Sequence, residues 1–259
     1  MTNLKQKIYV IHKSSSQIQV YDSITLSWLT EFKLEDVDEP NQLTACAVNN
    51  CLYIAGLKNQ AVYKAGSNGS EVLLKWRTDE DCYSLSTTKG GNVIVAGLLT
   101  QTLKEYTTHG ILLSIIILKP DISPAVAMSP WHALKLESGN YLICHGSSRV
   151  SKHRVCMISP DGVILKSFGG DSGSESNGLF GPYHLALDDK GNILVADCNN
   201  HRIVILSPNL QYLTEIKDSL RLPAKLCMDS TTGTLYVADN ELQDGKRANG
   251  QIVVLKRKQ

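Results

Sequence analysis

Two histidines occupy equivalent positions in the sequence, each two residues after a proline in the triplets PWH and PYH. They are His132 and His184. Because imidazole is a common metal ligand, one hypothesis is that the two rings meet near the mouth of a channel and hold a metal ion. The third equivalent position carries Lys225, whose ammonium group is a poor ligand. We therefore favour the alternative, in which both histidines are hydrogen-bonded residues at the rim of the channel.

A second polar pair flanks a short turn. Asp197 ends an apolar stretch and Arg202 follows five residues later, after the turn Cys-Asn-Asn-His. The two side chains would suit a binding pair. They would equally suit an internal ion pair, in which Arg202 bonds Asp197 or a neighbouring carbonyl and holds the turn. We favour the second interpretation.

Motifs for catalysis are missing from the sequence. It has no Gly-x-Ser-x-Gly elbow, no phosphate-binding loop and no His-Glu-x-x-His helix. Paired carboxylates occur only in stretches expected to be loops. The sequence therefore predicts a protein that is not an enzyme, with no catalytic residues, no metal ligands and no cofactor.

The stretch that positions the second pair, residues 178–206, has the pattern of a repeated unit. Residues 184–188 alternate in polarity, as a strand does, and Asp-Lys-Gly-Asn at 189–192 supplies a turn. Residues 193–197 form an apolar run typical of a strand covered on both faces, and a third strand begins at Ile203. After Ser-Pro-Asn, residues 211–216 supply a fourth strand.

This unit resembles an NHL repeat, a family named for an Asn-His-Leu triplet. The matching triplet here is Asn200-His201-Arg202. The resemblance also covers, in the family's order, Phe168-Gly169-Gly170, Phe180, Pro182, Asp188, Gly191-Asn192, Val195-Ala196-Asp197 and Ile203. It implies a β-propeller blade of four antiparallel strands.

A search for internal repeats extends the pattern along the chain. Apolar strands like the one at 193–197 end at residues 12, 56, 97, 145, 197 and 239, so the period lies between 41 and 52 residues. That period suits a four-stranded propeller unit, and no helical periodicity competes with it. We expect an all-β, six-bladed β-propeller of four-stranded antiparallel blades, with residues 1–259 as a single NHL-type domain.

Individual units depart from the pattern. The last three keep a proline before the inner strand, whereas the second and third units are interpreted as having lost it. Residues 1–7 are short and polar, so the first unit is expected to lack its inner strand, and the sixth to lack its outer strand because the sequence stops at Gln259. The count is 22 strands with incomplete first and last blades, and the missing strands would lie upstream if the chain is a fragment.

Charged residues gather in the connections expected on one face, the face of the turns between second and third strands. Early connections are acidic and later ones are mixed to basic, which favours a split surface that steers a partner. For any single residue, solvation of the surface is the simpler explanation. The acidic residues are Glu35, Asp36, Asp38, Glu39, Asp79, Glu80 and Asp81. The candidate partner-binding residues are Arg149, Lys152, Arg154, Arg202, Arg221, Lys246 and Arg247.

Two long connections are candidate binding loops. The stretch Asn240–Gly250 is polar and rich in Gly, Lys and Arg, and is the best candidate for a mobile loop. The stretch Gly169–Gly181 is rich in Gly and Ser, and would suit a binding loop or a flexible spacer.

Composition limits the cellular setting. The 259 residues carry a net charge of +1, which gives no overall attraction to nucleic acid or anionic membrane. No signal peptide and no apolar run long enough to cross a bilayer are apparent. Seven cysteines, several within apolar strands, favour a reduced protein in the cytoplasm.

Three functional hypotheses follow. The leading one is a non-catalytic propeller that recognises a protein, similar to the C-terminal propeller of tripartite-motif–NHL proteins, which selects partners for a ubiquitin ligase; nothing here resembles that family's RING, B-box or coiled coil. The second is binding of single-stranded RNA through the basic residues, opposed by the acidic ones and the near-neutral charge. The third is a metal-dependent propeller lyase or lactonase. A related propeller lyase holds zinc through a Pro-His-Gly motif, but Trp131, Tyr183 and Ala224 stand at those positions here.

Overall fold

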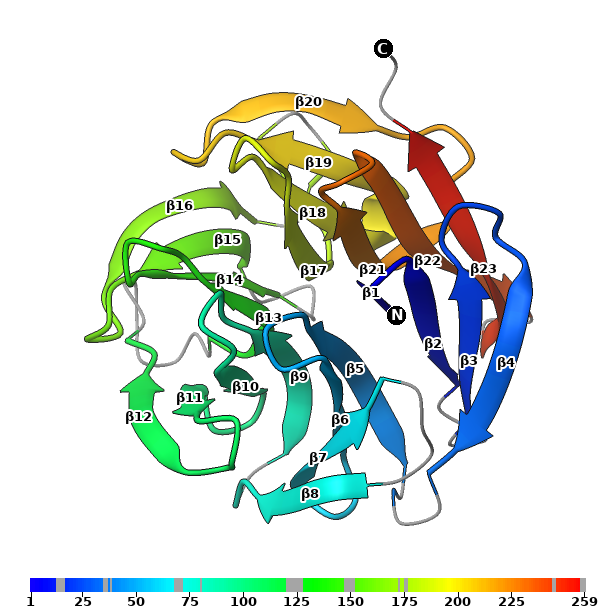
Figure 1. Cartoon of the computed structure of the whole chain (residues 1–259). Helices are drawn as coiled ribbons and strands as arrows, with labels where there is room; N and C mark the ends of the chain where they lie inside the picture. Colours follow the sequence, from blue (N-terminus) through cyan, green and yellow to red (C-terminus); the bar gives the residue numbers. More distant parts are fainter. Residues whose placement is uncertain are drawn as a thin grey trace. The chain divides into compact units, whose positions relative to one another are not determined.

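The chain folds into six antiparallel sheets in a computed structural model (Figure 1). The structure describes residues 1–12, 17–34, 37, 39–67, 72–79, 81–119, 128–146, 152–171, 173–174, 177–243 and 246–256, with the side chains of 12, 241–243 and 246–249 left aside. Five sheets have four strands and the last has three. Six such sheets in succession are the blades of a β-propeller. Within the described residues the only helical element is a single 3₁₀ turn.

The chain divides into two compact units, of which the first comprises Met1–Leu118 and Ala133–Gly139. Its three sheets each follow the order of the sequence from the innermost to the outermost strand. The first sheet holds β1 (Thr2–Leu4), β2 (Lys7–His12), β3 (Gln17–Asp22) and β4 (Trp28–Lys33); the second holds β5 (Pro40–Cys46), β6 (Cys51–Gly56), β7 (Ala61–Gly66) and β8 (Val72–Arg77); the third holds β9 (Cys82–Thr87), β10 (Val93–Gly97), β11 (Thr102–Tyr106) and β12 (Leu112–Ile117).

The second unit comprises Lys119–His132 and Asn140–Gln259. The remaining three sheets follow the same order, although residues 133–135 of β13 belong to the first unit. They hold β13 (Pro130–Lys135), β14 (Tyr141–His145), β15 (His153–Ile158) and β16 (Ile164–Gly170); β17 (Pro182–Leu187), β18 (Ile193–Asp197), the 3₁₀ turn η1 (Cys198–Asn200), β19 (Arg202–Leu206) and β20 (Tyr212–Ile216); and β21 (Leu222–Asp229), β22 (Thr234–Gln243) and β23 (Lys246–Lys256).

Five of the six second strands end where the repeat predicts, and the sixth, β22, continues past residue 239 to Gln243. The second strands form the centres of the cores. Every residue of β6, β10, β14 and β18 is buried. Burial on both faces explains their unbroken apolar sequences, and each large apolar side chain contributes about 1.5–3 kcal/mol. The turn predicted after β17 is present: Gly191 has a φ of +77°, and the Asp188 carboxylate accepts hydrogen bonds from the amides of Lys190 and Asn192.

Of the two blades predicted to be incomplete, the last is confirmed and the first is not. The last sheet does stop at three strands. The first sheet, however, has an inner strand: β1 pairs with β2, with Thr2 opposite Tyr9 and Leu4 opposite Lys7. The prediction of an incomplete first blade was therefore wrong, and the described chain has 23 strands instead of 22. A strand of three residues with one buried apolar side chain is too short to show alternation.

A second correction concerns the inner strand of the second blade. Pro40 opens β5 and lies opposite Gly56, the last residue of β6, with a bulge immediately after it. Pro182 and Pro223 likewise lie opposite Asp197 and Asp239, each followed by a bulge. The second blade has thus kept its proline. The bulge places Gln42 at the position that His184 and Lys225 hold in the later blades.

The outer strands share a feature that the sequence analysis missed. Each pairs with its neighbour through a bulge that leaves one leucine without a register partner, and that leucine is exposed. A bulge turns the extra residue out of the ladder, so these side chains lie on the surface by construction. The five are Leu29, Leu73, Leu113, Leu165 and Leu213.

Candidate functional site

The best-defined polar cluster lies where β18 ends and β19 begins. Asp197 is the last residue of β18, η1 carries the chain through the turn, and His201 takes a left-handed conformation before Arg202 opens β19. Asp197 and Arg202 lie opposite each other in the ladder, both essentially buried. Two buried charges are stable only when each is paired and hydrogen-bonded.

The carboxylate of Asp197 is fully engaged with groups from its own blade. One oxygen accepts the Phe180 amide at 2.6 Å. The other accepts the Asn200 side-chain amide at 2.8 Å and Nε of Arg202 at 2.8 Å. Burial raises the pKa of Asp197, while these three donors oppose the shift by stabilising the charged form. The carboxylate therefore joins the chain before β17 to the turn after β18.

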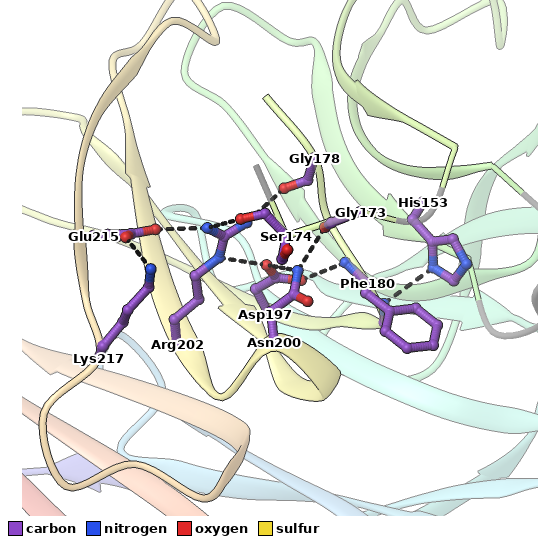
Figure 2. A network of polar contacts seen from close by, with 11 residues as sticks. His153, Gly173, Ser174, Gly178, Phe180, Asp197, Asn200, Arg202, Glu215 and Lys217 are labelled. Atoms are coloured by element: carbon purple, nitrogen blue, oxygen red, sulfur yellow. Dashed lines mark hydrogen bonds and ion pairs between the residues drawn. The ribbon is translucent and has the colours of Figure 1, made fainter. Parts of the chain in front are cut away.

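The guanidinium of Arg202 extends the cluster to the outer strand (Figure 2). Nη1 donates to Glu215 at 2.6 Å and to the Ser174 carbonyl at 2.9 Å, and Nη2 donates to the Gly178 carbonyl at 2.6 Å. Burial opposes the positive charge, but the bonds to Asp197 and Glu215 outweigh it and raise the pKa of Arg202. One side chain thus fastens the β16–β17 connection, the β18–β19 turn and β20 to each other.

Glu215 belongs to this cluster, and the sequence analysis did not single it out. It lies on β20 and bonds both Arg202 and the ammonium of Lys217, the latter at 2.5 Å. The Lys217 bond, with Arg202, lowers the pKa of Glu215. Strand alternation could have identified it. Glu215 lies opposite Val204, and Val204 is on the same face of β19 as Arg202 because the two are two residues apart.

The same position in the last sheet carries Asp239. Its carboxylate accepts the backbone amides of Arg221 and Leu222, the latter at 2.7 Å, and the side-chain amide of Gln251 at 3.1 Å. Gln251 lies opposite Asp239, where Arg202 lies opposite Asp197. In both sheets the acid opposite the proline near the start of the inner strand therefore anchors the start of that strand.

The corresponding position in the fourth sheet is different. His145 ends β14 and lies opposite Arg154, so that histidine replaces the acid. Nε of Arg154 donates to Nε2 of His145 at 3.3 Å. Nδ1 of His153 accepts the Gly181 amide at 3.0 Å, so His153 and Asp197 both hold the chain at the start of β17. Both histidines and Arg154 are buried.

His132 and His184 meet as the sequence predicts, with ring centroids 3.7 Å apart in a stacked arrangement. Nδ1 of His132 accepts the Leu185 amide and Nδ1 of His184 accepts the Leu226 amide, each at 3.3 Å. Burial, followed by the neighbouring His132 and Lys225, holds the pKa of His184 well below its usual value. These bonds are those of the hydrogen-bonded alternative, because the nitrogens facing the next inner strand are occupied by backbone donors.

Of the candidate partner-binding residues whose side chains the structure describes, two reach solvent far enough to meet a partner. Lys152 forms an ion pair with Asp171 at 2.6 Å and keeps part of its side chain in solvent. Arg221 is exposed. Arg154 and Arg202 are 4% and 1% exposed, and for Arg202 the structure shows the turn-holding ion pair that we favoured. Arg149 lies outside the described residues, and Lys246 and Arg247 are placed on β23 by backbone only.

The two candidate loops fare differently. The stretch Asn240–Gly250 was expected to be a loop, but β22 and β23 continue into it, with Glu241 opposite Ala248 and Gln243 opposite Lys246. The prediction of a loop there was wrong, because polar residues on a hairpin extension carry no apolar alternation. In the stretch Gly169–Gly181, the described carbonyls of Gly173, Ser174 and Gly178 accept bonds from Asn200 and Arg202, which anchors them.

Among the acidic residues, Glu39, Asp79 and Asp81 are described and lie in connections of the first unit. Glu39 and Asp79 have positive φ angles. Glu35, Asp36, Asp38 and Glu80 lie outside the described residues. The split between acidic and basic connections stays a prediction.

Across the described part of the chain, no group of three or more His, Cys, Asp or Glu side chains is placed to hold a metal ion. No described helix is long and apolar enough to cross a membrane. All seven cysteines are free thiols, and six of them are buried.

Solved structures share the fold at low sequence identity. A protein of unknown function from Bacteroides caccae is 20% identical, with a TM-score of 0.72 over 97% of this chain and 90% of that one. Hydrazine synthase of Kuenenia stuttgartiensis is 11% identical, with a TM-score of 0.68 over 97% and 92%. A catalytically inactive virginiamycin B lyase from Staphylococcus aureus with quinupristin is 12% identical, with a TM-score of 0.65 over 99% and 82%.

Sequence comparison gives a narrower result. No curated protein matches the chain at a significant level. Residues 183–206 match the NHL repeat family. The match begins within β17 and ends with β19, so it contains the turn, the Asp197–Arg202 pair and the first three strands of the fifth blade.

Proposed function

We propose that this chain is a non-catalytic, cytoplasmic scaffold that recognises a protein partner through the connections at the Asp197 end of its blades. Its context would be that of the tripartite-motif–NHL proteins, in which such a propeller selects partners for a ubiquitin ligase. The partner we expect presents acidic groups, because at this end of the second unit Arg221 is exposed and the half-buried Lys152 keeps part of its side chain in solvent.

The observation that carries the proposal is that the buried polar groups at this end anchor the connections between strands. Asp197, Arg202 and Asp239 form bonds within their own blades that anchor the connections. Ordered loops on a rigid frame are suited to binding, since less conformational entropy is lost when a partner docks. The stacked histidines, whose Nδ1 atoms bond backbone amides, support a structural role over metal chemistry.

The test compares charge reversals at the two ends of the blades. Partners captured from cells by the tagged chain are quantified for Lys152→Glu and Arg221→Glu. The matched control is Lys190→Glu, which reverses an exposed lysine at the turn between β17 and β18. We expect at least about a tenfold loss of the partner signal for the first two variants and none for the control. Equal capture by all three would contradict the proposal.

Binding of single-stranded RNA is the second candidate, favoured by the exposure of Arg221 and Lys152. The burial of Arg154 and Arg202 removes two of the seven cations on which that hypothesis relied. Titration with single-stranded RNA at two salt concentrations separates the candidates, because RNA affinity falls steeply with salt. Absence of binding at low salt would eliminate RNA. A lyase or lactonase would require bound metal, and elemental analysis of the purified chain tests it.

A further inference from the structure

The outer strand of the third blade exposes an unusual amount of apolar surface. Residues 111–118 read ILLSIIIL, without a charged or strongly polar side chain. Ile111, Leu112, Leu113, Ile115 and Ile117 are between 45% and 65% exposed. Within the described residues β12 pairs with β11 alone, so its other edge presents unpaired backbone groups.

The other blades show what normally stands at these positions. Ile115 and Ile117 lie opposite Lys104 and Thr102 of the third strand. At the corresponding positions the first blade has Glu31 and Lys33, the second has Lys75 and Arg77, the fourth has Ser167 and Gly169, and the fifth has Glu215 and Lys217. Leu113 is the leucine at the bulge, a position that is leucine in every outer strand. The two isoleucines are therefore the distinctive feature of β12.

Charges at these positions prevent one kind of contact in particular. When two copies of a strand pair antiparallel about a two-fold axis, one residue lies opposite itself and its neighbours are matched about it. At the Ile115 position, self-pairing would set lysine against lysine in the second blade and glutamate against glutamate in the first and fifth. Like charges directly opposite are destabilising, so those edges are protected from self-association.

Self-pairing of β12 carries no such penalty. Centred on Ile115, it sets Ile115 against Ile115 and Leu113 against Ile117 on one face of the joined sheet. The five exposed apolar side chains offer on the order of 500 Å² per copy, so that two copies together bury at most about 1,000 Å², the lower limit of specific interfaces. An interface of that size supports a weak dimer.

We propose that the chain forms a two-fold symmetric dimer by antiparallel pairing of β12 with β12 of a second copy, centred on Ile115. This goes beyond the proposed function, because the contact lies on an outer strand and not on the connections assigned to the partner.

Sedimentation of the chain from about 1 to about 200 μM tests the dimer, because that range brackets micromolar dissociation constants. We expect the wild-type chain to convert from monomer to dimer within it. The Ile115→Glu/Ile117→Lys double variant carries the residues native to the first and fifth blades, and should self-associate at least about tenfold more weakly. Ser167→Glu, at the same register position of β16, is the control and should dimerise like wild type.

Cysteine cross-linking tests the register without relying on a disruptive variant. Opposed residues in an antiparallel pair have Cα atoms about 4.5–5.5 Å apart, within the range of a disulfide. Under mild oxidation Ile115→Cys should give a covalent dimer faster than Ile117→Cys, while Ser167→Cys should give none. A wild-type chain that stays monomeric throughout the range would mean that another protein, or another segment of this chain, covers β12, and would overturn the proposal. So would a dimer that the double variant retains.

Discussion

Neighbouring blades of the second unit solve the same structural problem with different chemistry. The β18–β19 turn is closed by the Asp197–Arg202 ion pair, which also holds the preceding connection. At the ends of β14 and β15, His145 lies opposite Arg154, and His153 accepts the Gly181 amide beside the bond from Phe180 to Asp197. The first arrangement depends on a buried pair of opposite charges, the second on imidazole acceptors. We conclude that the repeat fixes the geometry of the strand end but allows different residues to stabilise it.

The largest expected effect comes from removing the arginine on each side of this comparison. Arg202→Ala leaves Asp197 as a buried charge and strips donors from two carbonyls, so it should cost about 3–5 kcal/mol of unfolding free energy. Arg154→Ala removes a bond to an imidazole nitrogen and should cost about 1–3 kcal/mol. Urea unfolding of both variants measures the difference. Equal losses of unfolding free energy in the two variants would contradict the distinction between the two arrangements.

The next effect concerns the residue that follows His145. Gly146 has a φ of +120°, and a Cβ there would lie 2.6 Å from the Lys152 carbonyl and 2.7 Å from Cα of His153. Because those atoms belong to the backbone, Gly146→Ala should cost at least about 2 kcal/mol more than Gly139→Ala. Gly139 also has a positive φ, of +86°, but nothing lies within 4 Å of its added Cβ. Thermal unfolding provides the comparison, and similar melting temperatures for the two variants would contradict it.

A smaller, pH-dependent effect is expected at His184. Since its pKa in the folded protein lies well below 6.5, the unfolded chain binds a proton near pH 6.5 that the folded chain does not. Stability should therefore fall as the pH drops below 6.5, with a contribution of up to about 1.4 kcal/mol per pH unit. His184→Gln, which copies Gln42 at the same position of β5, should remove this contribution. Urea unfolding at pH 7.5 and 5.5 measures it, and an unchanged difference between the two pH values would exclude His184 as its source.

The smallest effect is expected for Lys152. Its ion pair joins a side chain that is 29% exposed to an Asp171 side chain that is 89% exposed, so water screens the attraction. Lys152→Ala should change the unfolding free energy by at most about 1 kcal/mol. A loss comparable to that of Arg202→Ala would show that exposed and buried pairs contribute alike here, against the argument above.

The sequence predicted the repeat well because strand alternation and turn residues are local signals. The second strands and the Gly191 turn follow directly from them. Pro40 was overlooked because a bulge separates it from the apolar residues of β5, and β1 is too short for a pattern. The burial of Arg154 and Arg202 could not be read from charge, since only the ladder places each opposite its partner. The pairing of β22 with β23 beyond residue 240 was not predicted for the same reason, because these polar residues pair through their backbones and show no apolar alternation.

The guanidinium of Arg202 spans three segments that are distant along the chain. Releasing any one of them leaves part of the buried guanidinium without an acceptor, which is costly, so these segments should tend to open together. In hydrogen exchange, the Phe180 amide would then share its protection with the amides of β19, and the whole corner would behave as one cooperative unit.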